Sequence, residues 1–559
     1  MPPEASFTPP KKKPKLFWWL GGIALVLGAY FLFQLIGPSP RVVVSKQTTY
    51  ITTPLLPNGM PNYEEYVRNL AREGVTPQNN AAVLLFQALW PSELQPEQYD
   101  AVAAELGLHE IPSAESALQP LYGDANKKRV LDWLPKYDPT NGEPDVDGMI
   151  GAAQSSPWSS KQFPPLAAWI EANQKPLDLI VEASRRPRYY SPSPTLLDDQ
   201  HDMLITMLLP GTQSIREAAR GLACRAMWHS GENRLKDAWQ DTLALHRLGV
   251  LATQGPTMVD QLVAMAIRGM AVNATVALLG NDQLTKDLAH QIQQDLAKIT
   301  PITNMANTVD GMERIWGLDS VLYARVYGLD ALSGNEPSRE KSSSVNYTTI
   351  DWNVILSNMN RRYDQMASAM RLPKYEDRQK AVADFESKFN DDTQQMNQPR
   401  HLIAAAISRN ARSARVGSIF EGIMIPAVSA ATYAEDRTNS QLQLAQLAAA
   451  LAVFRVEHGA YPEKLGELVP EVLPALPVDF YHAQSFIYQR NDKGYLLYTA
   501  GANGKDDGGS NELERTYQGR ELDEMEEAEA NQANIPNDAD DFSVRLPHPP
   551  FKLPKPPAP

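Results

Sequence analysis

The sequence predicts a mainly α-helical protein with a single N-terminal transmembrane helix and a small C-terminal α+β module. Three observations lead to this fold class. Residues 16–36 form an uncharged apolar run, residues 63–458 repeatedly place apolar side chains at helical spacing, and residues 485–499 contain two β-rich runs around a turn. We therefore expect an anchor, a helical body and a mixed module, in this order along the chain.

The 559 residues divide into six parts by composition and periodicity. The final part is set apart by its charge, because residues 506–541 contain 13 Asp and Glu against two Arg, out of a net charge of −14 for the whole chain. Chains of this composition tend to be disordered. The predicted parts are a disordered cytoplasmic tail (1–15), a transmembrane helix (16–36), an extracytoplasmic, mostly helical region (37–200), an α-helical array (201–437), an α+β module (438–509) and a disordered tail, first acidic and then Pro-rich (510–559).

The apolar run at 16–36 has the length of a membrane anchor, because a bilayer core of about 30 Å requires about 20 apolar residues in a helix. Four lysines lie in residues 11–15, before the run, whereas only Arg41 and Lys46 follow it closely. This asymmetry predicts a cytoplasmic N-terminus and an extracytoplasmic body. A cleaved signal peptide is the alternative, but the run exceeds the usual apolar core of about 7–15 residues and no small-residue cleavage site follows it.

Composition excludes several other classes. The negative net charge argues against nucleic acid as the main partner, which would require a basic surface. The single cysteine, Cys224, cannot form an internal disulfide, and its apolar helical surroundings predict a buried structural residue. Residues 258–279 are apolar on most faces, but Asp260 and Arg268 indicate a core helix rather than a second membrane span.

The helical array contains one recognisable hairpin. Residues 214–230 and 235–243 show apolar stripes on either side of a break at 231–233. The pair resembles a single tetratricopeptide-like hairpin, a unit typical of protein-binding arrays, although no second copy follows at a fixed period. Further along, Arg409, Arg412 and Arg415 recur at three-residue spacing. We interpret this line as a solvated helix face, with an anionic partner as the alternative.

Residues 438–509 change in character. An apolar stripe ends at His458 and Gly459, a short helix is expected at 463–468, and the runs 485–490 and 494–499 form a hairpin around Asn491. The phrases LAAALAVFRVEHGAYPEKLGELV, LPALPVDFY and FIYQRNDKGYLLYTAGANGKDDGG carry a resemblance to the globular domain of the type II secretion major pseudopilin. The resemblance implies a spine helix packed on a small antiparallel sheet, and a closing loop that binds calcium.

Carried over by position, the resemblance implies that Asp506, Asp507 and, with a weaker match, Asn503 bind this calcium ion. The anchor lacks the cleavage signature of a pilus subunit, so we expect a pseudopilin-like module on a helical protein instead of a processed pilin. The whole combination also resembles bacterial membrane proteins of planctomycete type. Independently of any family, Asn and Asp on a Gly-rich loop supply the oxygen ligands that calcium prefers, and a solvated turn without metal is the alternative.

Catalytic motifs of the common hydrolase, metalloprotease and nucleotide-binding types do not occur in the sequence. His229 and His246 lie in helical patterns and are interpreted as structural. The sequence therefore favours a non-enzymatic, membrane-anchored interaction or scaffold protein with unidentified protein partners, linked through its module to secretion or pilus-like assembly. The alternative is an extracytoplasmic hydrolase with a site near Asp198–Asp202, where carboxylates surround His201.

Overall fold

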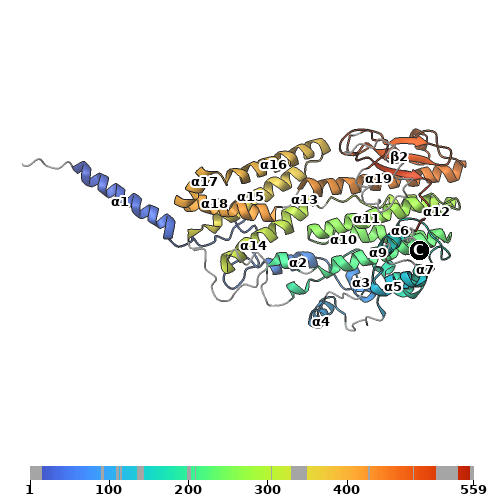
Figure 1. Cartoon of the computed structure of the whole chain (residues 1–559), viewed down its shortest axis with the longest axis horizontal. Coiled ribbons are helices and arrows are strands. Elements are labelled where there is room, and N and C mark those ends of the chain that lie inside the picture. Colours follow the sequence, from blue (N-terminus) through green and yellow to red (C-terminus); the bar gives the residue numbers. More distant parts are fainter. Residues whose placement is uncertain are drawn as a thin grey trace, which may run out of the picture. The chain divides into compact units, whose positions relative to one another are not determined.

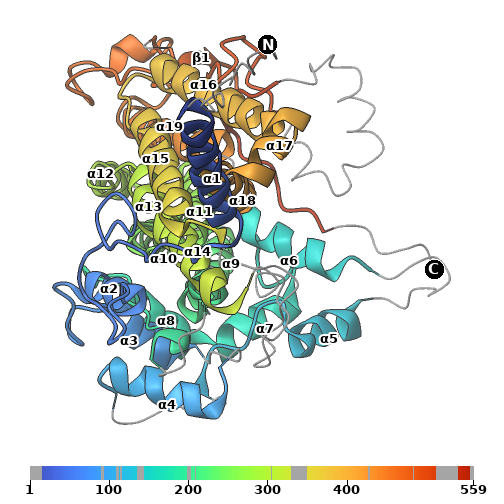
Figure 2. The same cartoon turned by 90° about the vertical axis from the view of Figure 1, so that its left-hand side faces the viewer.

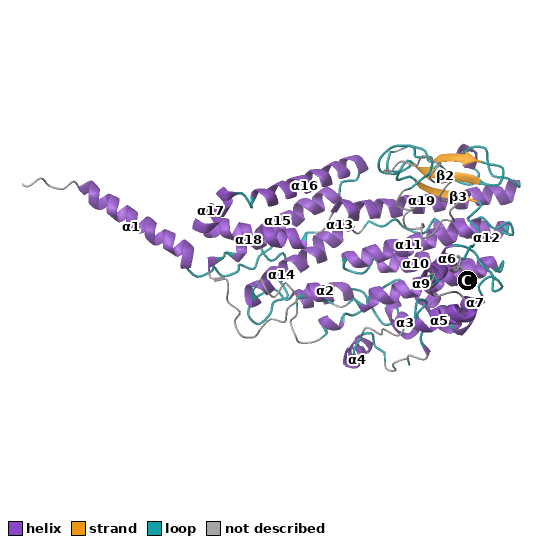
Figure 3. Cartoon of the chain, viewed as in Figure 1, coloured by secondary structure: helices purple, strands orange, loops and turns teal. Residues whose placement is uncertain are grey.

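The computed structural model is mainly helical, with one small antiparallel sheet, in agreement with the predicted fold class (Figure 3). It describes residues 15–89, 94–108, 113, 116–134, 144–197, 203–207, 209–303, 305–328, 349–425, 428–482, 484–511 and 539–553. Within these residues the helices follow one another along the chain, and the three strands come last (Figure 1).

The chain forms two compact units, each built from segments that are far apart in the sequence. This discontinuous division does not follow from the sequence pattern, which suggested consecutive domains. The first, here called the anchor unit, combines Met1–Tyr63, Arg314–Gln365 and Phe385–Pro426. The second, called the main unit, combines Glu64–Glu313, Met366–Asp384 and Ala427–Pro559.

The anchor unit contains the predicted anchor, α1 (Lys15–Ile36), followed by an irregular segment held by a buried polar network. Asn360 donates its side-chain amide to the carbonyl of Thr48 (2.7 Å), and Arg314 donates to the Asn360 side-chain oxygen (3.1 Å). Arg314 also pairs with Asp364 at 2.8 Å. These bonds tie residues 37–63 to α14 (Arg314–Tyr327) and α15 (Trp352–Met370). The later helices α16 (Tyr375–Gln395), α17 (Pro399–Ile407) and α18 (Arg409–Met424) also contribute to this unit, and α15 and α16 extend into the main unit.

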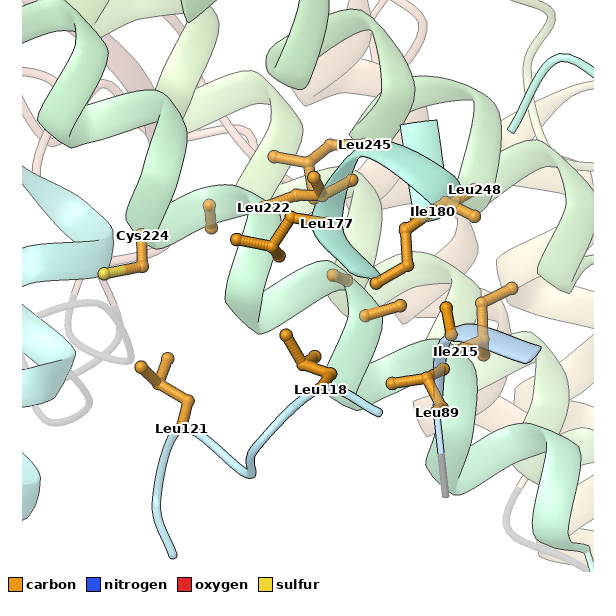
Figure 4. Packing of buried hydrophobic residues seen from close by; sticks show 14 of the residues in the cluster. Leu89, Leu118, Leu121, Leu177, Ile180, Ile215, Leu222, Cys224, Leu245 and Leu248 are labelled. Atoms are coloured by element: carbon orange, nitrogen blue, oxygen red, sulfur yellow. The ribbon is translucent and has the colours of Figure 1, made fainter. Parts of the chain in front are cut away.

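The first core of the main unit is assembled from its N-terminal helices and a central trio (Figure 4). In the trio, α10 (Leu235–Ala252) packs against both α9 (Pro210–Gly231) and α11 (Met258–Leu279), and Figure 2 looks along these helices. Cys224 is fully buried there, as predicted, and burial raises the pKa of its thiol. The other elements are α2 (Tyr63–Arg72), α3 (Ala81–Ala88), α4 (Pro96–Glu105), α5 (Asp124–Trp133), α6 (Val146–Ser155), α7 (Pro164–Ala172), α8 (Gln174–Ala183) and the 3-10 turns Pro194–Leu196 and Leu204–Thr206.

The second core of the main unit joins the long helix α19 (Val428–His458) to the sheet and to α12 (Lys286–Leu296). The sheet has the order β1-β2-β3 and is antiparallel throughout, with Leu497 opposite both Tyr488 and Val544. It packs on α19 at one end of that helix (Figure 1). The remaining elements are α13 (Met305–Thr308), the π-helix Val309–Glu313, the 3-10 turn Leu465–Leu468, β1 (Ile487–Arg490), β2 (Tyr495–Thr499) and β3 (Phe542–Leu546).

The predicted disorder of the C-terminal tail is wrong for residues 539–553. β3 pairs with β2 along its whole length and buries Phe542, Val544 and Leu546. Further on, Phe551 reaches the first core, where its ring lies 6.3 Å from that of Trp158. Alternating apolar residues thus stabilise this segment by burial against the sheet and helices. The rest of the predicted tail, residues 512–538 and 554–559, lies outside the described residues.

Within the part of the chain that the structure describes, three helical stretches are long and apolar enough to span a membrane, judged by length and composition. The span Trp19–Ile36 in α1 has no buried residues, whereas 61% of Met258–Leu279 is buried, as expected for a core helix. The third candidate, Arg409–His458, is 38% buried. The absence of buried residues over Trp19–Ile36 therefore distinguishes this stretch of α1 from the other two candidates.

Candidate metal centre

The loop after β2 is shaped by glycines in the left-handed region. Gly501, Gly508 and Gly509 have φ values of +55°, +67° and +74°, which glycine adopts without a steric penalty. A side chain at Gly501 would also collide with Asp540, since a Cβ there would lie 2.2 Å from Oδ1 of that residue. Asn511 and Asp540 then form an antiparallel bridge, so the two ends of the long β2–β3 connection meet beside the sheet.

Three carboxylates gather where these ends meet. Asp507, Asp540 and Asp541 each contribute an oxygen, and the three oxygens lie within 4.8 Å of one another. We call this set the acidic cluster. Like charges at this separation repel unless a cation or a proton neutralises them. The cluster therefore has the composition and spacing of a site for a hard divalent cation.

Backbone donors hold the acidic cluster in place. One oxygen of Asp541 (Oδ2) accepts from the N–H groups of Asp507 (2.9 Å) and Gly509 (2.8 Å). One oxygen of Asp540 (Oδ2) accepts from those of Ala502 (3.0 Å) and Asn503 (3.1 Å). The carboxylates are thus oriented before any cation arrives.

The second carboxylate oxygen of Asp541, Oδ1, is the main evidence for a bound ligand. Asp541 is 0% exposed, and its Oδ1 has no hydrogen-bond partner among the described residues. A buried, unsatisfied carboxylate oxygen is unfavourable by about 1–3 kcal/mol or more. Burial raises the pKa of Asp541 to about 6, and the neighbouring carboxylates of Asp507 and Asp506 act in the same direction against the backbone donors. A divalent cation would give the unpaired oxygen of Asp541 a partner and would offset the repulsion among the carboxylates. These residues therefore fit calcium.

The structure places the three residues predicted to bind calcium in different environments. Asp507 belongs to the acidic cluster. Asp506 instead accepts a hydrogen bond from the Tyr498 hydroxyl at 2.9 Å. The oxygen of Asn503 accepts from the backbone N–H of Lys505 (2.7 Å), while its amide nitrogen donates to Asp507 (3.2 Å).

Sequence reasoning missed Asp540 and Asp541. Both lie in the stretch that we assigned to a disordered tail on account of its acidity. The available signal was the alternation of Phe542, Val544 and Leu546 directly after them, which has the period of a half-buried strand. A strand there would have returned the two aspartates to the sheet edge where the β2 loop begins.

A second cluster of possible metal ligands is less suited to an ion. Glu457, His458 and Glu471 also bring three ligand atoms within 4.8 Å. However, Glu457 is already paired with Lys286 and His290, each at 3.0 Å. Its charge is therefore balanced within the protein, unlike that of the acidic cluster.

The histidines considered as catalytic candidates have structural contacts. His229 Nδ1 lies 3.1 Å from Asp241, whose two oxygens also receive a bidentate pair of hydrogen bonds from Arg225 at 2.7 and 3.0 Å. His246 is buried and shares a hydrogen bond with Thr275 at 3.0 Å. Burial lowers the pKa of His246 to about 3, so that it is neutral at physiological pH. The alternative site near Asp198–Asp202 lies outside the described residues.

Comparisons with models of protein families, with curated proteins and with solved structures found no match to this chain. The interpretation of the module therefore depends on its residues and geometry.

Proposed function

We propose that this chain is a membrane-anchored, extracytoplasmic scaffold protein whose C-terminal module is stabilised by a calcium ion. The observation that supports the anchoring role is the apolar stretch Trp19–Ile36 of α1, in which no residue is buried in the protein. Transfer of its side chains into a bilayer would remove a large apolar surface from water. The lysines in residues 11–15 favour a cytoplasmic N-terminus on the bacterial inner membrane.

Several buried titratable groups of the helical body pair with one another, which supports a binding role over a catalytic one. Arg225 and Asp241 form a buried ion pair between α9 and α10, and His229 lies beside Asp241 at 3.1 Å, so these groups serve the packing of the helices. The helices α9, α10 and α11 form a layered array of the kind that other proteins use to bind peptide or protein surfaces (Figure 1).

Two properties of the module support the calcium role and a link to secretion or pilus-like assembly. A helix that packs on a small antiparallel sheet is the arrangement that the pseudopilin resemblance implies, and α19 with β1–β3 has it. The acidic cluster then supplies three carboxylate oxygens that lie within 4.8 Å of one another. A bound calcium ion would connect the β2 loop to the start of β3.

Topology is tested in spheroplasts that express the chain with a C-terminal epitope. The proposal expects external protease to remove the epitope and the membrane fraction to retain an N-terminal fragment that includes α1. Protection of the epitope, or a mature protein that begins beyond Pro40, would contradict it.

Affinity purification of the intact chain from solubilised membranes tests the link to secretion. The proposal expects reproducible recovery of secretion or pilus-assembly components. It fails if none of them is enriched over a control purification of an unrelated single-pass protein.

A further inference from the structure

The helix α17 exposes an apolar stripe, contrary to the usual orientation of an amphipathic helix. The exposed fractions are 44% for Leu402, 64% for Ile403 and 49% for Ile407, while Ala405 on the opposite side is 8% exposed. Pro399 and Ala406 are exposed as well. These positions follow the helical spacing of one continuous face. We call Pro399, Leu402, Ile403, Ala406 and Ile407 the apolar stripe.

The junction between α17 and α18 is fastened to the last turn of α1, within the same unit. Arg409 donates to the carbonyl of Phe33 (2.8 Å) and its backbone N–H donates to the side-chain oxygen of Gln34 (3.2 Å). Arg412 donates to the carbonyl of Gln34 (3.0 Å). The Phe33 carbonyl also accepts the backbone N–H of Gly37 (3.0 Å), so Arg409 adds a second donor there, and both arginines place positive charge at the partially negative end of the anchor helix. A side chain at Gly37 would obstruct this contact, because its Cβ would lie 2.7 Å from Nη2 of Arg409.

This contact fixes the depth of α17 relative to a membrane. The 22 residues of α1 span about 33 Å at about 1.5 Å per residue, which matches a hydrocarbon core of about 30 Å. The last turn of α1 therefore lies at the boundary between acyl chains and head groups. Whatever packs against Phe33 and Gln34 lies at the same level, and α17 contacts α1 there.

The arginines beside this junction have no carboxylate partner among the residues that the structure describes. Among the ion pairs of the described residues, none includes Arg409, Arg412 or Arg415. Arg409 and Arg412 use one terminal nitrogen each for a carbonyl, and the Nε atoms of both have no hydrogen-bond partner among the described residues. Carbonyls accept hydrogen bonds but do not neutralise a full positive charge. Arg409 is buried, whereas Arg412 is half-buried, so an anion at this level would balance the charge of Arg412.

We propose that α17 lies in the outer interface of the bilayer, with its apolar stripe at the acyl boundary and with Arg412 and the exposed Arg400 paired to lipid phosphates. The inference rests on the proposed anchoring role of α1 and extends it. A helix of nine residues is too short to cross the bilayer, but it has the size and the one-sided apolar face to lie along the surface. Phosphate matches the forked donors of arginine, and lipid head groups supply it at this depth.

The test uses the full-length chain in vesicles of phosphatidylethanolamine and phosphatidylglycerol. Since the only cysteine, Cys224, is buried, an introduced cysteine can be labelled selectively with an environment-sensitive fluorophore. Three single variants are compared: Ile403→Cys in the apolar stripe, Phe31→Cys in the anchor, and Ser387→Cys, an exposed position of α16 in the same unit. Nitroxide-labelled lipids then report which probe contacts the bilayer.

The proposal expects blue-shifted emission and strong lipid quenching at positions 403 and 31, with shallower quenchers more effective at 403, and no lipid quenching at 387. Quenching at 31 without quenching at 403 would overturn the interfacial assignment and leave the anchor intact. Loss of quenching at both positions would overturn the anchoring role itself. Quenching at 403 by a second labelled copy, without lipid quenching, would assign the stripe to self-association and contradict the proposal.

Discussion

Arg225 in the main unit and Arg412 in the anchor unit show two ways to accommodate an arginine in a protein. The guanidinium of Arg225 meets the buried carboxylate of Asp241 in a bidentate pair and that of Asp178 at 2.7 Å. The guanidinium of Arg412 meets a backbone carbonyl of the anchor helix. Both geometries satisfy hydrogen bonds, but only the first one balances the charge within the chain.

The difference shows where a partner is required. In a buried ion pair the two charges balance each other within the protein, so neither residue has free charge to bind a ligand. A cation on a carbonyl, or a carboxylate such as Asp541 that faces other carboxylates, retains a net charge that something outside the chain has to balance. We therefore propose a structural role for Arg225, a lipid phosphate for Arg412 and calcium for the acidic cluster.

The largest effect should follow from breaking the complete pair. Asp241→Asn leaves Arg225 and His229 buried beside a neutral amide, and loss of one partner of a buried pair costs about 3–5 kcal/mol. We expect a lower midpoint of thermal unfolding for the detergent-solubilised chain, followed by intrinsic tryptophan fluorescence. The control is Asp178→Asn, because the Asp178 side chain is 73% exposed and its loss should cost less than about 1 kcal/mol. Equal midpoints for the two variants would contradict the structural assignment.

The second effect concerns the acidic cluster. Calcium at about 100 times its dissociation constant should stabilise the folded module by about 2.7 kcal/mol, and Asp541→Asn should abolish this gain. Titration calorimetry of the solubilised chain measures the binding directly. Asp506→Asn is the matched control, since that carboxylate bonds Tyr498, and it should retain calcium binding. Binding that survives Asp541→Asn but not Asp506→Asn would assign the ion to a different ligand set.

The third effect is the pH dependence of the same site. The folded-state pKa of Asp541 is raised to about 6 by burial, so without calcium this residue contributes most to stability when protonated and loses that contribution as pH rises through about 6. Calcium requires the ionised form, and its affinity should therefore fall as pH drops below about 6. The measurement is calcium affinity from pH 5 to 8, for the wild-type chain and for Asp541→Asn. A flat profile for the wild-type chain would show that Asp541 does not bind the ion.

The smallest effect is expected at the membrane. Arg412→Gln should weaken retention of phosphatidylglycerol about fivefold, since one basic residue near an anionic surface contributes about 1 kcal/mol. Native mass spectrometry of the solubilised chain counts the retained lipids. Lys388→Gln removes an exposed cation from α16 of the same unit and should leave retention unchanged. Equal losses in the two variants would indicate a general charge effect without a lipid site at α17.

Local signals predicted much of the fold. Residues 258–279 form α11 as expected, because Thr257 and Asp260 complete a capping box at the start and Gly280 follows the end. The hairpin around Asn491 is confirmed too, with Arg490 opposite Tyr495. Such signals lie within a few residues of the element that they determine, so a single sequence suffices to find them.

Contacts between distant residues could not be predicted in this way. Asn173 separates α7 from α8, and its side chain accepts from the backbone N–H of Gln119, 54 residues earlier in the chain. The acidic cluster was half predicted for the same reason, since Asp507 lies on the expected loop whereas Asp540 and Asp541 return only through the pairing of β3. The line of arginines at 409–415 was interpreted as a solvated face, because nothing local shows that α1 ends beside it.

The late return of β3 makes the C-terminal segment behave like a separable peptide. Residues 512–538 connect it to the loop after β2, while residues 539–553 contribute an edge strand, two of the three clustered aspartates and the Phe551 contact to the first core. A chain cut once within this connection should remain a two-fragment complex on a sizing column. Chelation of calcium should then release the shorter fragment, so that the ion would act as a reversible clasp between two polypeptides.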